Sequence, residues 1–366
     1  MSQTLNREFG AVITRLIQKE NLTRKESESA FISLLNNQVT EMQQGAFLAA
    51  LTAKGETRQE VAGAWQAIYD LDTTKIDLAP GLHPVDNSGT GMDTFKTFNI
   101  STAAALVAAA GGIPMARHGA RAITSVCGTV DMAEALGVDV ECPAGVVANS
   151  IKTANIGLFN GMSPHTHPRA LGRILSQICF GSTLNIAASL ANPALPSIGV
   201  RGVYSKAMVR PVAEVMQDIG YTRAIVLHGA LEGSGMGMDE ASVCGLTHCA
   251  QILETGEIHE FTIDPKPLGI AAKSPEALSP GTDIKSEARR FAGLMANQEN
   301  SVRKDAVLLN AGLIFLVAGK AKDLEGGIQA AATLLETGAA FEALENWVRA
   351  QNTDPEKGLA TLHSLV

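Results

Sequence analysis

Residues 86–102 read "DNSGTGMDTFKTFNIST" and run directly into the alanine-rich segment "AAALVAAAGG" of residues 103–112. A glycine-rich turn that leads into a helix presents backbone N–H groups and the positive end of the helix dipole, which together suit an anion. Ser101 and Thr102 stand at the expected N-cap of that helix. Neither the GK[ST] ending of a Walker A loop nor a GxGxxG pattern is present. The residues alone fit a phosphate site and, equally, an ordinary strand-to-helix turn.

Beyond this stretch, short apolar and β-branched runs alternate with alanine-rich helical patterns. Candidate strands are "GIPMARH" (112–118), "RAIVLH" (223–228) and "GEIHEFTI" (256–263), and "RPVAEVMQDIG" (210–220) is one of the candidate helices. This alternation is typical of an α/β unit. We therefore expect a central sheet that is flanked by helices.

The two ends of the chain have a purely helical pattern. Apolar residues recur at three- and four-residue steps from Phe9 to Asp72, and the Pro/Gly-bearing segment 77–91 ends this unit. Near the C-terminus, residues 305–321 and 324–351 each predict one helix, and the two are expected to pack together. The predicted domains are a helical one over residues 1–75 and an α/β one over residues 80–366.

Composition narrows the possible partners. The chain has 366 residues, of which 46% are hydrophobic, and its formal net charge is -8, so no basic surface for nucleic acid or anionic membrane is indicated. The five cysteines form no CxxC pair, which argues against a zinc knuckle or a disulfide framework. The N-terminus lacks an apolar signal region. We expect a cytoplasmic protein with reduced thiols that acts on small molecules, without nucleic acid or membrane partners.

A second polar island covers residues 116–137. Arg117 and His118 offer a cation and hydrogen-bonding groups, and Gly119 permits close backbone approach. A hydroxyl-rich turn before the next helix follows, made of Thr124, Ser125, Cys127, Gly128 and Thr129. The arginine suits a phosphate. For His118 the alternative is a half-buried histidine that is satisfied by the backbone.

A third island, "HGALEGSGMGMDEASVCG" (228–245), contains the adjacent acids Asp239 and Glu240 after a Gly/Met-rich loop. Magnesium is usually bound through one or two carboxylates together with phosphate oxygens of a substrate. An acidic pair beside two anion-binding loops therefore predicts a magnesium-diphosphate site. Taken alone, the pair is also typical of a solvated helix start.

A fourth island, within residues 160–193, carries His165, His167, Arg169 and Arg173 in a polar turn that enters a helix. The HxH spacing could ligate a metal, but the sequence positions no third ligand. We interpret this turn as contacting substrate or as merely structural.

In their order, these islands resemble the anthranilate phosphoribosyltransferase family, whose members carry a GTGGD loop followed by TFNIST, a KHGN segment and a later DE pair. The corresponding segments here are "GTGMD" (89–93), "TFNIST" (97–102), "RHGA" (117–120) and "GMDEAS" (237–242). Shorter matches, which extend the resemblance over nearly the whole chain, are "KGET" (54–57), "LANP" (190–193), "GVYS" (202–205), "GEI" (256–258) and "LLNAG" (308–312).

The resemblance implies a magnesium-dependent transferase that moves 5-phosphoribose from phosphoribosyl pyrophosphate to the amino group of anthranilate, in tryptophan biosynthesis. It implies a homodimer with a nucleoside phosphorylase-like fold, in which helices near 168–192 join the N-terminal domain. The residues that would bind phosphoribosyl pyrophosphate are Gly89, Thr90, Gly91, Asp93, Thr97, Asn99, Ser101, Thr102, Arg117 and Cys127. Acceptor residues would be His118, Ala120, His167 and Arg173, and Asp239 and Glu240 would bind Mg²⁺.

Several positions depart from the family pattern. Met92 replaces a glycine, Ala120 replaces the asparagine of KHGN, Arg117 replaces its lysine, and Cys127 stands where serine is usual. The family's arginine for the acceptor carboxylate has no gap-free counterpart, and Arg173 is only the nearest candidate. A "GxGMGM" insertion also precedes Asp239. These changes fall on the acceptor side or on the metal loop.

Three functions remain open at this level. The first is transfer to anthranilate. The second is transfer to another aromatic or nucleobase acceptor, or a nucleoside phosphorylase activity, since "CGTVD" (127–131) echoes the GGT-x-D segment of that fold. The third is a binding protein without catalysis, against which the intact Asp239–Glu240 pair argues.

Overall fold

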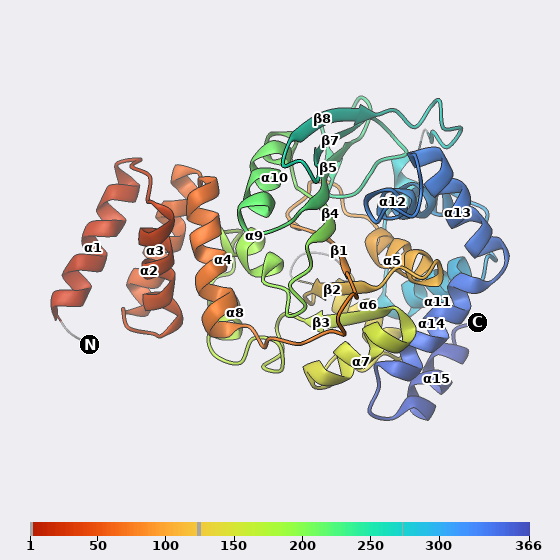
Figure 1. The fold of residues 1–366 in the computed structure, drawn as a ribbon, viewed down its shortest axis with the longest axis horizontal. Helices are drawn as coiled ribbons and strands as arrows, with labels where there is room; N and C mark the ends of the chain where they lie inside the picture. Colours follow the sequence, from red (N-terminus) through yellow and green to blue (C-terminus); the bar gives the residue numbers. More distant parts are fainter. Residues whose placement is uncertain (1–2, 123–125, 273) are drawn as a thin grey trace.

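The computed structural model describes residues 3–122, 126–272 and 274–366. Four helices form a bundle at one end of the molecule (Figure 1): α1 (Gln3–Ile17), α2 (Arg24–Leu35), α3 (Glu41–Lys54) and α4 (Arg58–Asp72). Thr23, Thr40 and Thr57 precede the last three of these helices, and each hydroxyl accepts a hydrogen bond from a backbone N–H of the first turn. The threonines thus set where these helices begin.

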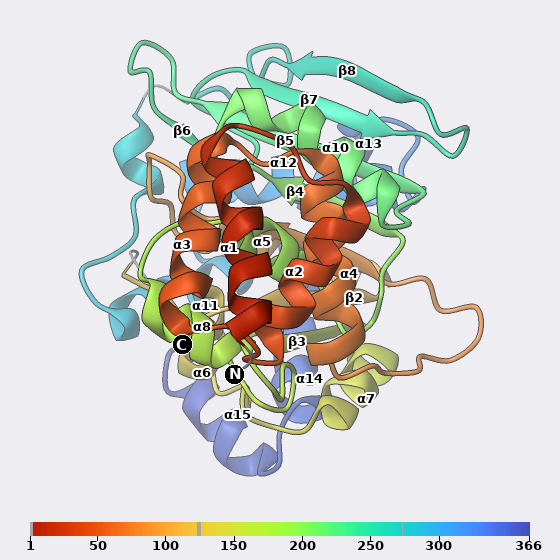
Figure 2. The same ribbon diagram turned by 90° about the vertical axis from the view of Figure 1, so that its left-hand side faces the viewer.

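Segments far along the chain complete the helical end. Helices α8 (Leu171–Ile178), α9 (Leu184–Leu190) and α10 (Val209–Asp218) share one buried apolar cluster with α1 to α4. Figure 2 shows the four N-terminal helices in front of the sheet-bearing part. The boundary between residues 75 and 80 stays a prediction.

A mixed sheet forms the other end of the molecule. Its strands run in the order β3-β2-β1-β4-β5-β7-β8, with β6 beside β5; β1 to β5 are parallel, and β6, β7 and β8 join in antiparallel pairs. The strands are β1 (Val85–Gly89), β2 (Met115–Gly119), β3 (Ile156–Asn160), β4 (Ile198–Gly202), β5 (Arg223–Ala230), β6 (Gly237–Met238), β7 (Thr247–Ile252) and β8 (Ile258–Ile263). The three candidate strands correspond to β2, β5 and β8. The predicted α/β class with a helix-flanked sheet is confirmed.

The remaining helices lie around this sheet or pack on the helices that cover it (Figure 1). They are α5 (Ile100–Ala110), α6 (Thr129–Ala135), α7 (Ala144–Ala154), α11 (Ile284–Met295), α12 (Val302–Val317), α13 (Leu324–Glu336), α14 (Ala339–Ala350) and α15 (Pro355–His363), with 3₁₀ turns at Lys206–Met208 and Pro275–Leu278. Among the described residues no helix is both long and apolar enough to cross a bilayer. The single helix expected over 324–351 is wrong, because Gly338 takes a φ of 80° and separates α13 from α14.

A side chain from the C-terminal part closes one edge of the sheet. Gln351 is fully buried, accepts a hydrogen bond from the backbone N–H of Leu158 at 2.8 Å and donates to the carbonyl of Leu158 at 2.9 Å. The indole N–H of Trp347 donates to the same amide oxygen at 2.9 Å. The amide of Gln351 therefore pairs with the edge strand β3 as a neighbouring strand would.

Candidate active site

The candidate site lies where the parallel strands end. In an open α/β sheet, ligands bind beyond the carboxyl ends of the strands. The loop of residues 89–99 leaves β1 at this edge, and two bonds hold it to β4: Thr90 N–H donates to the Gly202 carbonyl at 3.1 Å, and Tyr204 N–H donates to the Thr90 hydroxyl at 3.2 Å. We call residues 89–99 the donor loop.

Three carboxylates meet at the donor loop. Ligand oxygens of Asp93, Asp239 and Glu240 lie within 4.8 Å of one another. Asp239 accepts a hydrogen bond from Gly91 N–H at 2.8 Å, and Glu240 accepts one from the Thr97 hydroxyl at 3.3 Å. The structure thus brings the predicted acidic pair onto the predicted glycine-rich turn.

Burial and neighbouring charges raise the pKa values of Glu240 and Asp93. Burial, followed by the charges of Asp239 and Asp93, raises the pKa of Glu240 well above its ordinary value. Burial and Asp239 raise the pKa of Asp93 to about 6, although Lys96 opposes this from 2.7 Å. A divalent cation with oxygen preference would relieve this repulsion, so the donor set fits Mg²⁺.

Two glycines permit the close approach of Asp239. A Cβ at Gly202 would overlap the backbone carbonyl of Asp239, and a Cβ at Gly89 would overlap its carboxylate. Glycine is therefore required at the ends of both β1 and β4 for this packing.

The Gly/Met-rich insertion before Asp239 pairs with the donor loop. The end of the insertion forms β6. The Gly237 N–H donates to the Thr94 hydroxyl at 3.0 Å, and this hydroxyl lies 3.3 Å from the Gly237 carbonyl, to which it can donate. The same carbonyl accepts a hydrogen bond from Phe95 N–H at 3.1 Å. The insertion therefore holds the middle of the donor loop beside the acidic cluster.

Met92 connects the donor loop to the α8–α9 segment. Its φ of 65° lies in the left-handed region, where glycine is favoured and methionine is strained. The Met92 sulfur lies over Gly181, where a Cβ would overlap it. Both residues line a cavity of about 180 Å³, with Thr52 and Glu56 of the helical end and Tyr204 after β4.

The start of α5 differs from the expectation. The helix begins at Ile100 with Asn99 as its N-cap, so the placement of Ser101 and Thr102 at the cap is wrong by two to three residues. Asn99 makes no side-chain capping bond, and its amide nitrogen donates to the Cys127 carbonyl at 3.2 Å. Ser101 and Thr102 lie in the first turn, whose N–H groups face the loop as expected.

Arg117 lies behind the donor loop. It is buried, and it donates to the Asn87 side chain at 2.9 Å and to the Thr102 hydroxyl at 2.7 Å. Burial lowers its pKa to about 10, while Asp86 and Glu240 act in the opposite direction. Arg117 therefore stays a cation at neutral pH, and its hydrogen bond to Thr102 places this charge at the first turn of α5.

Arg303 supports the donor loop from α12. Its guanidinium lies 4.5 Å from the ring centre of Phe98 and pairs with buried Glu287 at 2.6 Å. Phe98 N–H donates to the Leu278 carbonyl at 2.9 Å. Sequence reasoning missed this arginine, because a cation in the first turn of a helix has no pattern that distinguishes it from a solvated one.

Cys127 has a neutral thiol. It is buried, and burial with the charges of Asp131 and Glu287 raises its pKa to about 12. The nearby Thr124 and Ser125 of the predicted hydroxyl-rich turn lie outside the described residues.

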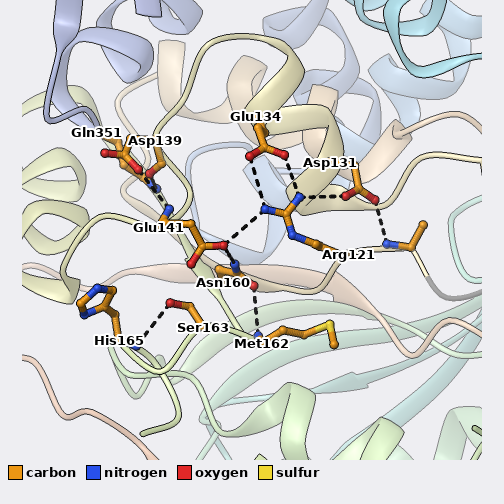
Figure 3. Close-up of polar contacts among 11 residues, drawn as sticks. Arg121, Asp131, Glu134, Asp139, Glu141, Asn160, Met162, Ser163, His165 and Gln351 are labelled. Carbon is orange, nitrogen blue, oxygen red and sulfur yellow. Dashed lines mark hydrogen bonds and ion pairs between the residues drawn. The ribbon is translucent and has the colours of Figure 1, made fainter. Parts of the chain in front are cut away.

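Three carboxylates surround Arg121, which lies just after β2 (Figure 3). Arg121 donates to Asp131 at 3.2 Å, to Glu134 at 2.7 Å and to Glu141 at 3.3 Å. Asp131 also accepts from the N–H groups of Ala122, at 2.8 Å, and Gly128, at 3.0 Å. The Asp131 carboxylate therefore links Ala122, two residues after exposed Ala120, to Gly128 at the start of α6. Asp131 lies three residues after Gly128, and this spacing is a helix-capping signal from which its contact with the Gly128 N–H could have been predicted.

Two predicted acceptor residues meet as a buried histidine pair. The Nε2 atoms of His118 and His167 lie 3.1 Å apart. His118 Nδ1 lies 3.2 Å from the Ser189 carbonyl, and His167 Nδ1 lies 2.6 Å from the Asp72 carbonyl. His165 is exposed, and within the described ranges the potential metal-binding group is the Asp93, Asp239 and Glu240 cluster alone. His165 and His167 of the HxH pattern therefore do not form a common site.

Arg173 points toward the helical end. It donates to the Gln44 side chain of α3 at 3.0 Å and to the Leu34 carbonyl of α2 at 3.4 Å. The structure does not bring this residue to the histidine pair or to the donor loop.

Substitution Arg173→Ala is therefore expected to leave the KM for the acceptor within about twofold, while the lost hydrogen bonds reduce the free energy of unfolding by about 1 kcal/mol. Steady-state kinetics and urea denaturation measure the two effects, with exposed Arg169→Ala as control. A tenfold rise in acceptor KM would return Arg173 to the site.

Comparisons with known proteins agree over nearly the full length. Residues 82–341 match the model described as "Glycosyl transferase family, a/b domain", and residues 11–71 match "Glycosyl transferase family, helical bundle domain". The anthranilate phosphoribosyltransferase of Rubrobacter xylanophilus is 35% identical over 330 residues, covering 90% of this chain and 94% of that protein. The Bacillus mycoides enzyme of the same name is 34% identical over 351 residues, covering 95% and 99%.

Solved structures show the same arrangement. Anthranilate phosphoribosyltransferase from Thermus thermophilus matches with a TM-score of 0.82 at 30% identity, covering 93% of this chain and 98% of that one. The Saccharomyces cerevisiae enzyme in complex with PRPP and Mg matches with a TM-score of 0.81 at 22% identity, covering 95% and 98%; this second likeness concerns the fold alone.

Proposed function

Since this chain belongs to the anthranilate phosphoribosyltransferase family, we propose that it transfers 5-phosphoribose from phosphoribosyl pyrophosphate to the amino group of anthranilate and releases pyrophosphate. The observation that carries this function is the cluster of Asp93, Asp239 and Glu240 on a glycine-rich turn at the N-terminus of α5. Such a site can hold a diphosphate and a divalent cation side by side.

The donor loop would bind the diphosphate and ribose. Backbone N–H groups of the turn and of the first turn of α5 would face the phosphate oxygens, and the Asn99 and Ser101 side chains lie at the same helix end. Mg²⁺ bound by Asp93, Asp239 and Glu240 would neutralise charge on the diphosphate. Gly202 and Gly89 matter because they admit Asp239 to this position.

The reaction is a displacement at the anomeric carbon of the ribose. A carbon–nitrogen bond to the amine forms while the carbon–oxygen bond to pyrophosphate breaks, and the amine loses one proton. Stabilising the departing pyrophosphate is the main task of the protein, so the N–H groups of the donor loop and Arg117 behind it supply positive potential. Covalent chemistry by a side chain is not needed.

Pyrophosphate release from phosphoribosyl pyrophosphate and Mg²⁺ tests this function against a panel of anthranilate, other aromatic amines and nucleobases. We expect release with anthranilate and formation of phosphoribosyl anthranilate. Release only with another amine would favour a paralogue with a different acceptor, for which the placement of Arg173 and the exposed Ala120 argue. No release with any acceptor would overturn a transferase function.

We also propose that the protein is a homodimer, as the family resemblance implies. Light scattering after gel filtration would then give twice the chain mass of 38.3 kDa. A single-chain mass at micromolar concentration would contradict the dimer without affecting the transfer reaction.

A further inference from the structure

The His118–His167 pair joins three parts of the molecule. His118 is on β2, His167 is in the turn before α8, and their outer nitrogens face carbonyls at the end of α4 and within α9. Gly161 lies against the His118 ring, where a Cβ would come within 2.8 Å of Nε2. The pair is therefore enclosed on several sides.

Two neutral imidazole rings carry two N–H hydrogens, but the pair makes three nitrogen contacts. A carbonyl oxygen only accepts, so both Nδ1 atoms must carry hydrogen to bond Ser189 and Asp72. The hydroxyl of Thr73 also approaches His167 Nδ1, at 3.5 Å, but donates to the Ile68 carbonyl instead. Both Nε2 atoms then hold lone pairs and face each other at 3.1 Å. One added proton converts this repulsion into a hydrogen bond.

Burial opposes the charged form of both rings. Burial lowers the pKa of His167, while the carbonyl and the charge of Asp72 act to raise it. Burial, the neighbouring His167 and the charge of Arg201 lower the pKa of His118 to about 3. Because the two rings interact strongly, they titrate as one unit. A proton taken up by one ring therefore belongs to the pair, and its charge opposes a second proton.

Two arginines compare with the histidine pair as cations for a carboxylate. Arg173 is committed to Gln44 and Leu34 in the helical end. Arg201 of β4 is buried, and its two terminal nitrogens donate to the hydroxyls of Ser88 and Ser189, while its Nε has no hydrogen-bond partner among the described residues. His118, in contrast, lies one residue from the end of β2, at the same sheet edge as the donor loop.

We propose that the His118–His167 pair takes up one proton when a carboxylate-bearing acceptor binds, and that this shared imidazolium charge recognises the carboxylate. The inference rests on the proposed function and assigns the basis of its acceptor specificity. A buried charge is little screened, so it can act on a carboxylate at the mouth of the site without direct contact.

The direction of the pH dependence follows from this linkage. A carboxylate nearby raises the pKa of the pair, so the complex holds more protons than the free protein. Affinity for the acceptor is therefore strongest at low pH and weakens as pH rises through the pKa of the bound pair, by up to about tenfold per pH unit. An uncharged acceptor analogue shows no such change.

Calorimetric titration at pH 6, 7 and 8, in two buffers of different ionisation enthalpy, measures proton uptake directly. Magnesium and pyrophosphate are present in place of the donor, so that no transfer takes place. We expect uptake that approaches one proton at its maximum with anthranilate, and less than about 0.2 with 2-aminobenzamide, which has the same ring and amine but no charge. Binding of anthranilate without uptake overturns the inference and leaves the transfer reaction untouched.

Variants and spectra separate the pair from other titrating groups. His167→Gln should abolish the uptake, whereas His165→Gln, an exposed histidine two residues away, should leave it unchanged. Imidazole nitrogen NMR of the unmodified protein needs no variant: both Nδ1 atoms should be protonated throughout, and one Nε2 proton should appear with anthranilate. Uptake that persists in His167→Gln, or unchanged ring signals, would contradict the proposal.

Discussion

Replacement of Asp239 by Asn together with Glu240 by Gln is expected to lower kcat/KM by at least about 10³-fold, because both charges that would hold magnesium on the diphosphate are removed. The fold should survive. Since the pKa of Glu240 is raised in the folded protein, its ionised form destabilises that state, and a neutral amide relieves the cost. The midpoint of thermal unfolding in EDTA should therefore be unchanged or higher.

A matched control removes two charges elsewhere. Glu254→Gln with Glu257→Gln lies in the exposed turn between β7 and β8 and should retain full activity. Circular dichroism and the pyrophosphate assay, run on both double variants over a range of Mg²⁺ concentrations, give the comparison. Unchanged magnesium-dependent turnover in the Asp239/Glu240 variant would exclude these acids from metal binding.

The second large effect is on stability. Arg303→Met is expected to reduce the free energy of unfolding by about 3–5 kcal/mol, because Glu287 is left as a buried charge without its partner. The same change removes donors to the carbonyls of Ala277 and Ser279 and the contact with the Phe98 ring. Since Phe98 belongs to the donor loop, the KM for phosphoribosyl pyrophosphate should rise as well.

Urea denaturation followed by tryptophan fluorescence measures this loss. Exposed Arg290→Met on α11 is the control and should change stability by less than about 0.5 kcal/mol. Adding Glu287→Met to Arg303→Met should restore much of the stability, because the unpaired charge is then gone. A loss below about 1 kcal/mol in the single variant would show that the ion pair is not needed for stability.

Local patterns accounted for the elements and for part of the site. Threonine caps, alanine-rich runs and β-branched strands act over a few residues, so the α/β class and the helical N-terminal part could be predicted. The glycine-rich turn and the Asp239–Glu240 pair are each contiguous, and their complementary chemistry, anion-binding N–H groups beside carboxylates that suit magnesium, predicted that they act together. The start of α5 was misplaced by two to three residues, because Asn99 occupies the N-cap position without a side-chain capping bond and its amide donates to Cys127 instead.

Contacts between distant segments could not be predicted in the same way. The Arg173 side chain reaches α3 and α2, more than a hundred residues earlier, and nothing near it in sequence indicates this direction. The approach of His167 to His118 depends on how α8 packs on the helical end. Arg303 reaches Phe98 only because α12 packs on α5. Tertiary packing decides each of these.

The amide of Gln351 on β3 bears on how the chain is made. Synthesis runs from the N-terminus, and 193 residues separate Leu158 from the glutamine that satisfies its N–H and carbonyl. During translation this margin of the sheet stays open to foreign strands until the last helices have left the ribosome. A premature stop before Gln351 would therefore expose the β3 edge of the sheet, rather than remove an expendable tail.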